Sequence, residues 1–255
     1  MVHTRICFYW TAVLVLALGV QTAHAGDKDT NLIERFSLGV WAGAGTVWFG
    51  GAEADTDSIA SSRKPGIAAG LPVAFAFTDW LSGTSGMEVA TSGARLEMVA
   101  GPGSGDLSMV YLQVPVIATL APYRHRHIRP YLSTGPVLGF MLTCTLKFGD
   151  GGGDGSDCSD TTRALDVRWA AGAGIDVSLP WEGTVDVGVR YELGLVRLDD
   201  TDRQQDYRNR ALFFTVGYQH NLGDLVDRVR GKSGRDTAGP AEAAESDQDS
   251  AEAPE

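Results

Sequence analysis

The most conspicuous candidate for chemistry is an acidic, glycine-rich stretch at residues 149–160. Its four carboxylates could supply oxygen ligands to Ca²⁺. An EF-hand loop starting at Asp150 fails, because its twelfth residue is Thr161 rather than Glu. Only one partial copy of the calcium-binding nonapeptide repeat is present, so that motif is not supported either. We expect a hydrated surface loop, and the weak candidate metal ligands are Asp150, Asp154, Asp157 and Asp160.

Histidines, the usual general bases, are poorly placed for catalysis. His125 and His127 lie in a short basic segment, and His220 ends a late apolar segment. None stands beside a serine or aspartate of a long loop. We therefore predict that the protein is not an enzyme and needs no cofactor.

Charged residues also occur inside otherwise apolar segments. Arg190 with Glu192, or Arg168 with Asp166 and Asp176, could be read as acid–base groups. Ion pairing in a protein interior is the simpler interpretation. The predicted interior ion-pairing residues are Glu88, Asp166, Arg168, Asp176, Asp186, Arg190 and Glu192.

The segments that carry these charges alternate apolar residues with small or polar ones. Successive side chains of a strand point to opposite faces, so this period predicts β-strands with one apolar face. Residues 165–179 are the clearest example, with Leu165, Val167 and Trp169 on one face and Asp166 and Arg168 on the other. Eight such segments are expected, at residues 36–49, 65–77, 81–93, 108–120, 129–148, 163–179, 184–197 and 210–222.

The connections between these segments alternate between long and short. An outer-membrane barrel has long outer loops, short periplasmic turns and both termini in the periplasm. The expected fold class is therefore an all-β, eight-stranded antiparallel up-and-down transmembrane β-barrel. The uniformly apolar face would meet lipid and the glycine-rich, charged face would fill the interior, leaving no wide pore.

Residues 1–25 resemble an export signal rather than part of the fold. Arg5 precedes a 15-residue run that is apolar apart from one threonine, too short for a membrane-spanning helix. Small residues then favour cleavage between Ala25 and Gly26. We expect a cleaved signal peptide (1–25), a periplasmic lead (26–35), the barrel (36–222) and an acidic, disordered periplasmic tail (223–255).

Export bears on the two cysteines that remain after cleavage. Cys144 and Cys158 are fourteen positions apart, near the outer end of the fifth segment, in an oxidising compartment. This placement is compatible with a disulfide that closes the base of the glycine-rich loop, or with two free thiols. We predict the disulfide.

Aromatic residues fall near the expected ends of the strands. Tryptophan and tyrosine favour the membrane–water interface, because each joins an apolar ring to a polar group. The predicted interface aromatics are Trp48, Trp80, Tyr123 and Trp181.

Composition excludes one class of partner. The formal net charge of −11 argues against a nucleic-acid binder, which should show a basic face. The partners expected are the lipid bilayer and, during biogenesis, the barrel-assembly machinery. The latter would read the last strand at 215–222, which follows the usual terminal pattern except for His220.

Short motifs recur in the predicted strands: Lys64-Pro65-Gly66, Tyr111-Leu112-Gln113-Val114-Pro115, Arg129-Pro130-Tyr131-Leu132, Gly135-Pro136-Val137-Leu138-Gly139, Gly172-Ala173-Gly174 and Arg190-Tyr191-Glu192-Leu193-Gly194-Leu195. Through these motifs the sequence from Lys64 onward resembles the PorT-like outer-membrane β-barrel domain family, over most of residues 36–222. The resemblance rests on spacing and small residues rather than on a reactive motif, and it implies only the fold and the location, an outer-membrane barrel in the Gram-negative cell envelope.

The function expected is that of a small outer-membrane barrel with a structural or surface-interaction role. One alternative is a soluble periplasmic barrel that binds a small hydrophobic ligand, although the charged inner face disfavours an apolar pocket. The third is an outer-membrane barrel hydrolase, which the positions of the histidines disfavour.

Overall fold

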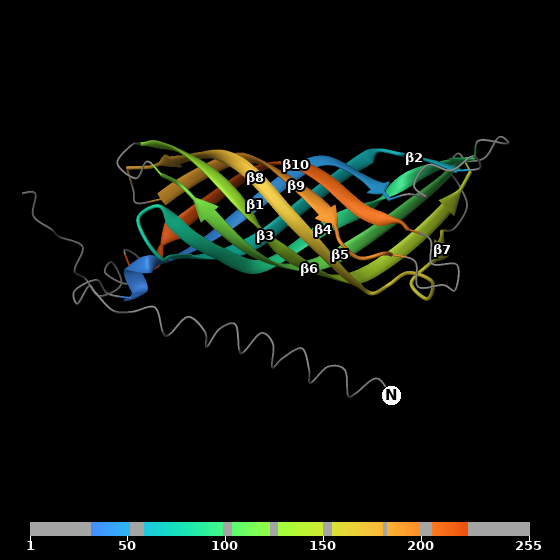
Figure 1. Ribbon diagram of the computed structural model, residues 1–255, viewed down its shortest axis with the longest axis horizontal. Helices are drawn as coiled ribbons and strands as arrows, with labels where there is room; N and C mark the ends of the chain where they lie inside the picture. The colour runs from blue at the N-terminus through green and yellow to red at the C-terminus, as the bar shows by residue number, and fades with distance from the viewer. Residues whose placement is uncertain are drawn as a thin grey trace, which may run out of the picture. The chain divides into compact units, whose positions relative to one another are not determined.

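Eight long antiparallel strands, each hydrogen-bonded to its neighbours along the chain, make up the wall of a barrel (Figure 1). The computed structural model describes residues 32–51, 59–98, 104–122, 127–149, 155–180, 183–198 and 206–223. The wall strands are β1 (Phe36–Gly50), β3 (Lys64–Ala76), β4 (Leu81–Met98), β5 (Ser104–Leu120), β6 (Ile128–Phe148), β8 (Leu165–Ser178), β9 (Gly183–Gly194) and β10 (Arg208–Asn221).

The barrel closes because the first and last strands pair along their lengths. The β1–β10 register runs from Ser37 opposite Asn221 to Gly50 opposite Arg208. On the other side of the wall, β4 pairs with β5 from Leu81 opposite Leu120 to Glu97 opposite Ser104. The predicted up-and-down barrel of eight wall strands is confirmed, and a 3-10 helix (Leu32–Arg35) precedes it. None of the helical residues described forms a helix long and apolar enough to cross a membrane.

Alternation along each strand separates two chemically different faces. Glycine, alanine and polar residues share the inward face with a few large side chains. The outward face is apolar over the middle of the wall. Its exposed residues include Leu38, Val40, Ile67, Leu71, Met87, Val89, Leu132, Ile175, Val187, Phe214 and Val216. The interior is therefore polar and the outside apolar, which is the arrangement that a bilayer requires.

One end of the barrel carries more strand structure than the alternation predicts. Residues 94–107 were expected to form a loop, yet β4 and β5 continue to Glu97 and Ser104. Arg95 lies opposite Asp106 in this extension, so these two charged residues belong to a paired, outward-facing ladder rather than to a loop. Two short strands widen it, since β2 (Ile59–Ser62) pairs with β4 and β7 (Ser156–Asp157) pairs with β6 (Figure 1).

The other end is closed by tight turns. The amide of Leu179 donates to the carbonyl oxygen of Gly183 at 2.8 Å between β8 and β9. Between β3 and β4, the hydroxyl oxygen of Thr78 accepts a hydrogen bond from the amide of Leu81 at 3.0 Å. These short connections fix the register of their hairpins. Below, the two ends are called the loop end and the turn end.

Candidate functional site

A buried ion network fills the middle of the barrel, and Arg190 of β9 is at its centre. The two terminal nitrogens of Arg190 donate to the two carboxylate oxygens of Glu88, on β4, at 3.0 and 2.9 Å. The carboxylate of Glu192 lies 2.9 Å from the same guanidinium. The Arg190 guanidinium also lies over the ring of Trp41, 5.3 Å from its centroid. The indole nitrogen of Trp41, on β1, donates to Glu88 at 3.1 Å. The cluster therefore joins side chains of β1 and β4 to Arg190 of β9 across the lumen.

Arg168 of β8 extends the network toward the loop end. Its side chain is 0% exposed and contacts Asp166 at 2.6 Å and Glu192 at 3.1 Å. Its guanidinium also lies 4.8 Å from the ring centroid of Tyr111. Glu192 therefore bridges the two arginines. With three carboxylates and two guanidiniums, the network is nearly balanced in charge, as burial demands.

Uncharged polar groups complete the hydrogen bonds of this network. Asn209 of β10 donates to Asp166 at 2.7 Å and accepts from the hydroxyl of Ser92 at 2.6 Å. It also donates to the hydroxyl of Tyr111 at 3.4 Å. Gln113 donates to Glu192 at 3.5 Å. Side chains of β1, β4, β5, β8, β9 and β10 are thus joined across the lumen.

A second polar group lies nearer the turn end. Arg129 of β6 donates to Asp176 of β8 at 3.1 Å, and Asp176 is the cross-strand partner of Asp186. The hydroxyl of Tyr131 donates to Asp186 at 3.5 Å. The Tyr131 side chain lies against the glycines of the neighbouring strands. A Cβ at Gly174 would come 2.6 Å from the tyrosine oxygen, so glycine there makes room for the ring.

The structure thus places every predicted ion-pairing residue inside the barrel, in two groups. Sequence reasoning assigned no interior role to Trp41, Ser92, Tyr111, Gln113 or Asn209, which hold the charges in place. Asn209 lies in a segment that was predicted to be a loop, so the alternation could not predict that its side chain points inward. A polar residue at an inward position of the alternation was the available signal for Ser92 and Gln113.

An apolar cluster covers the network at the loop end. Buried Phe49, Met109 and Leu198 pack with Tyr111 and Cys144, and Leu96, Leu107 and Tyr207 contact them. Leu198 is held in this cluster by backbone hydrogen bonds from its amide to the carbonyl oxygen of Tyr207, at 2.9 Å, and from the amide of Arg163 to its own carbonyl oxygen, at 2.8 Å. The polar interior is therefore separated from the loop end by apolar side chains.

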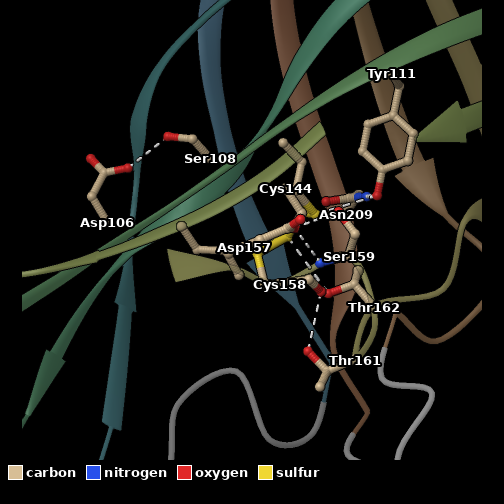
Figure 2. The surroundings of a disulfide bond; sticks show 12 residues. Asp106, Ser108, Tyr111, Cys144, Asp157, Cys158, Ser159, Thr161, Thr162 and Asn209 are labelled. Carbon is tan, nitrogen blue, oxygen red and sulfur yellow. Dashed lines mark hydrogen bonds between the residues drawn. A yellow bond between two sulfur atoms is a disulfide. The ribbon is translucent and has the colours of Figure 1, made fainter. Parts of the chain in front are cut away.

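A disulfide between Cys144 and Cys158 anchors the glycine-rich loop to this cluster (Figure 2). Their Cα atoms are 5.2 Å apart, and Cys144 faces inward from β6. Beside the disulfide, Asp157 accepts hydrogen bonds from the amide and hydroxyl of Ser159, at 2.9 and 2.6 Å (Figure 2). These bonds, chiefly the one from the hydroxyl, lower the pKa of the Asp157 carboxyl.

The structure describes two of the four predicted metal ligands. Asp150 and Asp154 lie outside the described residues, and Asp157 is engaged by Ser159. Asp160 is exposed in the following turn. Within the described part of the chain, no three His, Cys, Asp or Glu side chains are grouped closely enough to hold a metal ion.

The interface aromatics and the histidines occupy the ends of the barrel. Trp48 ends β1 at the loop end, 6.2 Å from Tyr191 between ring centroids. Trp80 is exposed in the β3–β4 turn. His127 and His220 lie at the turn end, and His220 contacts the Tyr218 hydroxyl at 3.1 Å. Tyr123, Trp181 and His125 lie outside the described residues, as do the predicted cleavage site at Ala25–Gly26 and most of the tail.

Several solved structures and one family profile are similar to this chain. Solved structures similar to this chain include Neisserial surface protein A, at 14% identity with 72% of this chain and 96% of that chain covered and a TM-score of 0.45. OprG of Pseudomonas aeruginosa is 11% identical, with 74% and 100% covered and a TM-score of 0.39. No curated protein matches the chain significantly. The family profile described as "Outer membrane protein beta-barrel domain" matches residues 11–219, and the chain belongs to this family of outer-membrane β-barrels.

Proposed function

We propose that this small outer-membrane barrel is a closed scaffold with a structural or surface-interaction role. The observation that carries this proposal is the ion network, which joins opposite sides of the wall through Arg190 and Glu88. The apolar cluster above it adds a second obstruction at the loop end. A lumen filled in this way has no continuous water-filled path of the kind that porins use.

The outward presentation of the loop end belongs to the same proposal. Among the described residues, the disulfide and the strands β2 and β7 extend the structured part of this end beyond the wall. A structured loop end is suited to contacts with molecules outside the cell. The chain would reach this position after signal-peptide cleavage between Ala25 and Gly26 and recognition of β10 by the barrel-assembly machinery. Membership of the narrower PorT-like family remains part of this proposal.

The proposed role includes no catalysis. His127 and His220, the histidines in the described ranges, lie at the turn end, where the backbone amide of Ser178 donates to the carbonyl oxygen of His127 at 2.9 Å. The inward carboxylates are held by arginines inside the wall. Among the described residues, His220 contacts the Tyr218 hydroxyl, and no serine hydroxyl is hydrogen-bonded to a histidine ring, as a base-activated nucleophile requires.

Single-channel recording tests the closed lumen. The purified full-length protein is inserted into planar lipid bilayers, beside a general porin as the positive control. We expect no stable open level. A steady porin-like conductance from folded, heat-modifiable protein would overturn the proposal.

Cysteine labelling tests the orientation. Glu97→Cys places a thiol at the loop end and His127→Cys places one at the turn end, both at exposed positions. A maleimide too large to cross the outer membrane should label the first variant in intact cells. The second should react only after the outer membrane is permeabilised. The reverse pattern would show that the loop end faces the periplasm.

A further inference from the structure

Two arginines flank a tryptophan on the outward face of the barrel, at the loop end. We propose that Arg63, Trp48 and Arg210 form a binding site for the phosphorylated headgroup of an outer-leaflet lipid. This proposal rests on the proposed outward orientation of the loop end. The site is separate from the interior ion network, because it lies on the opposite face of the wall.

The three side chains form a row across neighbouring segments of the wall. Trp48 of β1 is the cross-strand partner of Arg210 of β10. On the other side of Trp48, the Arg63 guanidinium lies over the indole ring, 4.9 Å from its centroid. Cross-strand partners have Cβ atoms about 5 Å apart, so the Arg210 side chain starts beside Trp48, and its guanidinium extends over Gly50. One phosphate group, or two on the same headgroup, could contact both guanidiniums.

This row marks the edge of the lipid-facing surface. Arg210 follows Phe214 and Leu212 along the outward face of β10, while Ala211 and Phe213 point inward and are fully buried. Phe214 is 64% exposed, as expected of a lipid-facing side chain. Toward the loop end, Arg210 is the first charged residue on this face of β10. The ring of Tyr191 beside Trp48 is typical of the membrane–water interface.

The guanidinium groups of Arg63 and Arg210 are available to bind an anionic ligand. Neither forms a salt bridge with a carboxylate of the described residues, whereas nearby Lys64 is paired with Asp106, and Arg208 with Asp206 at 2.8 Å. The Nε of Arg210 is buried without a hydrogen-bond partner. The Arg210 guanidinium lies over Gly50, where any side chain would collide with it.

Charge and geometry both favour a phosphorylated lipid. The chain carries a formal net charge of −11, so two adjacent arginines that pair with no carboxylate of the described residues stand out on its surface. Guanidinium groups bind phosphate oxygens through paired hydrogen bonds. Apolar side chains, including Phe214, lie directly below the row and would contact acyl chains. A soluble phosphate compound would gain nothing from that apolar surface.

Native mass spectrometry of the full-length protein in detergent tests the site. The probes are lipid A, lipid A with both phosphates removed, and inorganic phosphate as a competitor. We expect lipid A to bind, the dephosphorylated lipid to bind much more weakly, and inorganic phosphate to compete poorly. The R63Q/R210Q double variant should bind lipid A about tenfold more weakly or worse, since each cation near a membrane surface contributes appreciably to such binding.

A second double variant, R95Q/K147Q, is the matched control. It removes the same charge from the outward face of the loop end, on both sides of Asp106, and leaves the row intact. Its lipid A affinity should stay close to that of the parent. Equal losses in the two double variants, equal binding of the dephosphorylated lipid, or efficient competition by inorganic phosphate would each overturn the proposal. Heat-modifiability of every variant verifies that the barrel is folded, and failure of the orientation test would appear separately in the cysteine labelling.

Discussion

Arg190 on β9 and Glu88 on β4 are joined by two hydrogen bonds, of 3.0 and 2.9 Å, across the lumen between opposite sides of the wall. The residues are 102 positions apart in the chain. Such a paired contact between planar groups is directional as well as charged, so it links the two halves of the barrel in one arrangement. Its position makes it the natural target for the first prediction.

Removing the arginine should destabilise the barrel strongly. Arg190→Met leaves Glu88 and Glu192 close together in the interior without the cation that both contact. Breaking a buried ion pair in this way costs about 3–5 kcal/mol of unfolding free energy. Reversible urea unfolding in lipid vesicles measures the loss.

Glu88→Gln provides the comparison for Arg190→Met. It leaves Arg190 with Glu192 and keeps an oxygen that can accept from Trp41. We expect a smaller loss than for Arg190→Met. If Glu88→Gln were as destabilising as Arg190→Met, Glu192 would not hold Arg190 as the geometry indicates.

The disulfide should be formed in the protein isolated from the cell envelope. Thiol titration of the unreduced, denatured, signal-cleaved protein should detect no free thiol, because Cys144 and Cys158 are then the remaining cysteines. Two free thiols would contradict this.

Removing the disulfide should affect the loop more than the wall. A cross-link that closes a loop of this length stabilises by about 3 kcal/mol in the chain-entropy view. C144S/C158S should therefore be cut faster by external protease near residues 149–160 and still show heat-modifiability. Loss of heat-modifiability would indicate that the disulfide is needed for the barrel itself.

A charged residue on the lipid-facing surface should be tolerated near the loop end but not halfway along the strands. Val189 lies midway along β9 and is 38% exposed, whereas Leu195 follows the strand at the loop end and is 47% exposed. An arginine at the bilayer midplane costs about 2–4 kcal/mol, against about 0–1 kcal/mol near the interface. Val189→Arg should therefore lower the unfolding free energy much more than Leu195→Arg. Equal losses of unfolding free energy in the two variants would mean that Leu195 does not lie near the membrane–water interface.

The glycines beside Tyr131 should resist substitution. A Cβ at Gly174 would lie 2.6 Å from the Tyr131 hydroxyl oxygen and against the carbonyl oxygen of Val187. Overpacking of this kind costs about 1–3 kcal/mol. Gly174→Ala should destabilise the barrel in urea unfolding. Gly105→Ala is the control, since its nearest contact would be at 3.5 Å, and a comparable loss there would contradict the steric explanation.

The class of fold and the division of its two faces could be predicted from local sequence patterns. Alternation is a local property, and each strand carries it independently of its partners. The segment at Leu165 to Ser178 therefore showed which of its side chains point inward before any neighbour was known. The alternation of long and short connections could also be read from the sequence. Together with the apolar and polar faces of the strands, it predicted a transmembrane barrel with charged residues inside.

The tertiary structure alone decided which inward residues meet. Glu88 contacts Arg190, and Asp166 contacts Asn209, because strand register and barrel closure bring their strands to matching heights. Register depends on all eight wall strands at once, so no single segment specifies it. The same reason explains the extension of β4 and β5 beyond Gly93 and Ser108: a stretch that was predicted to be a loop becomes strand when a neighbour of matching length pairs with it.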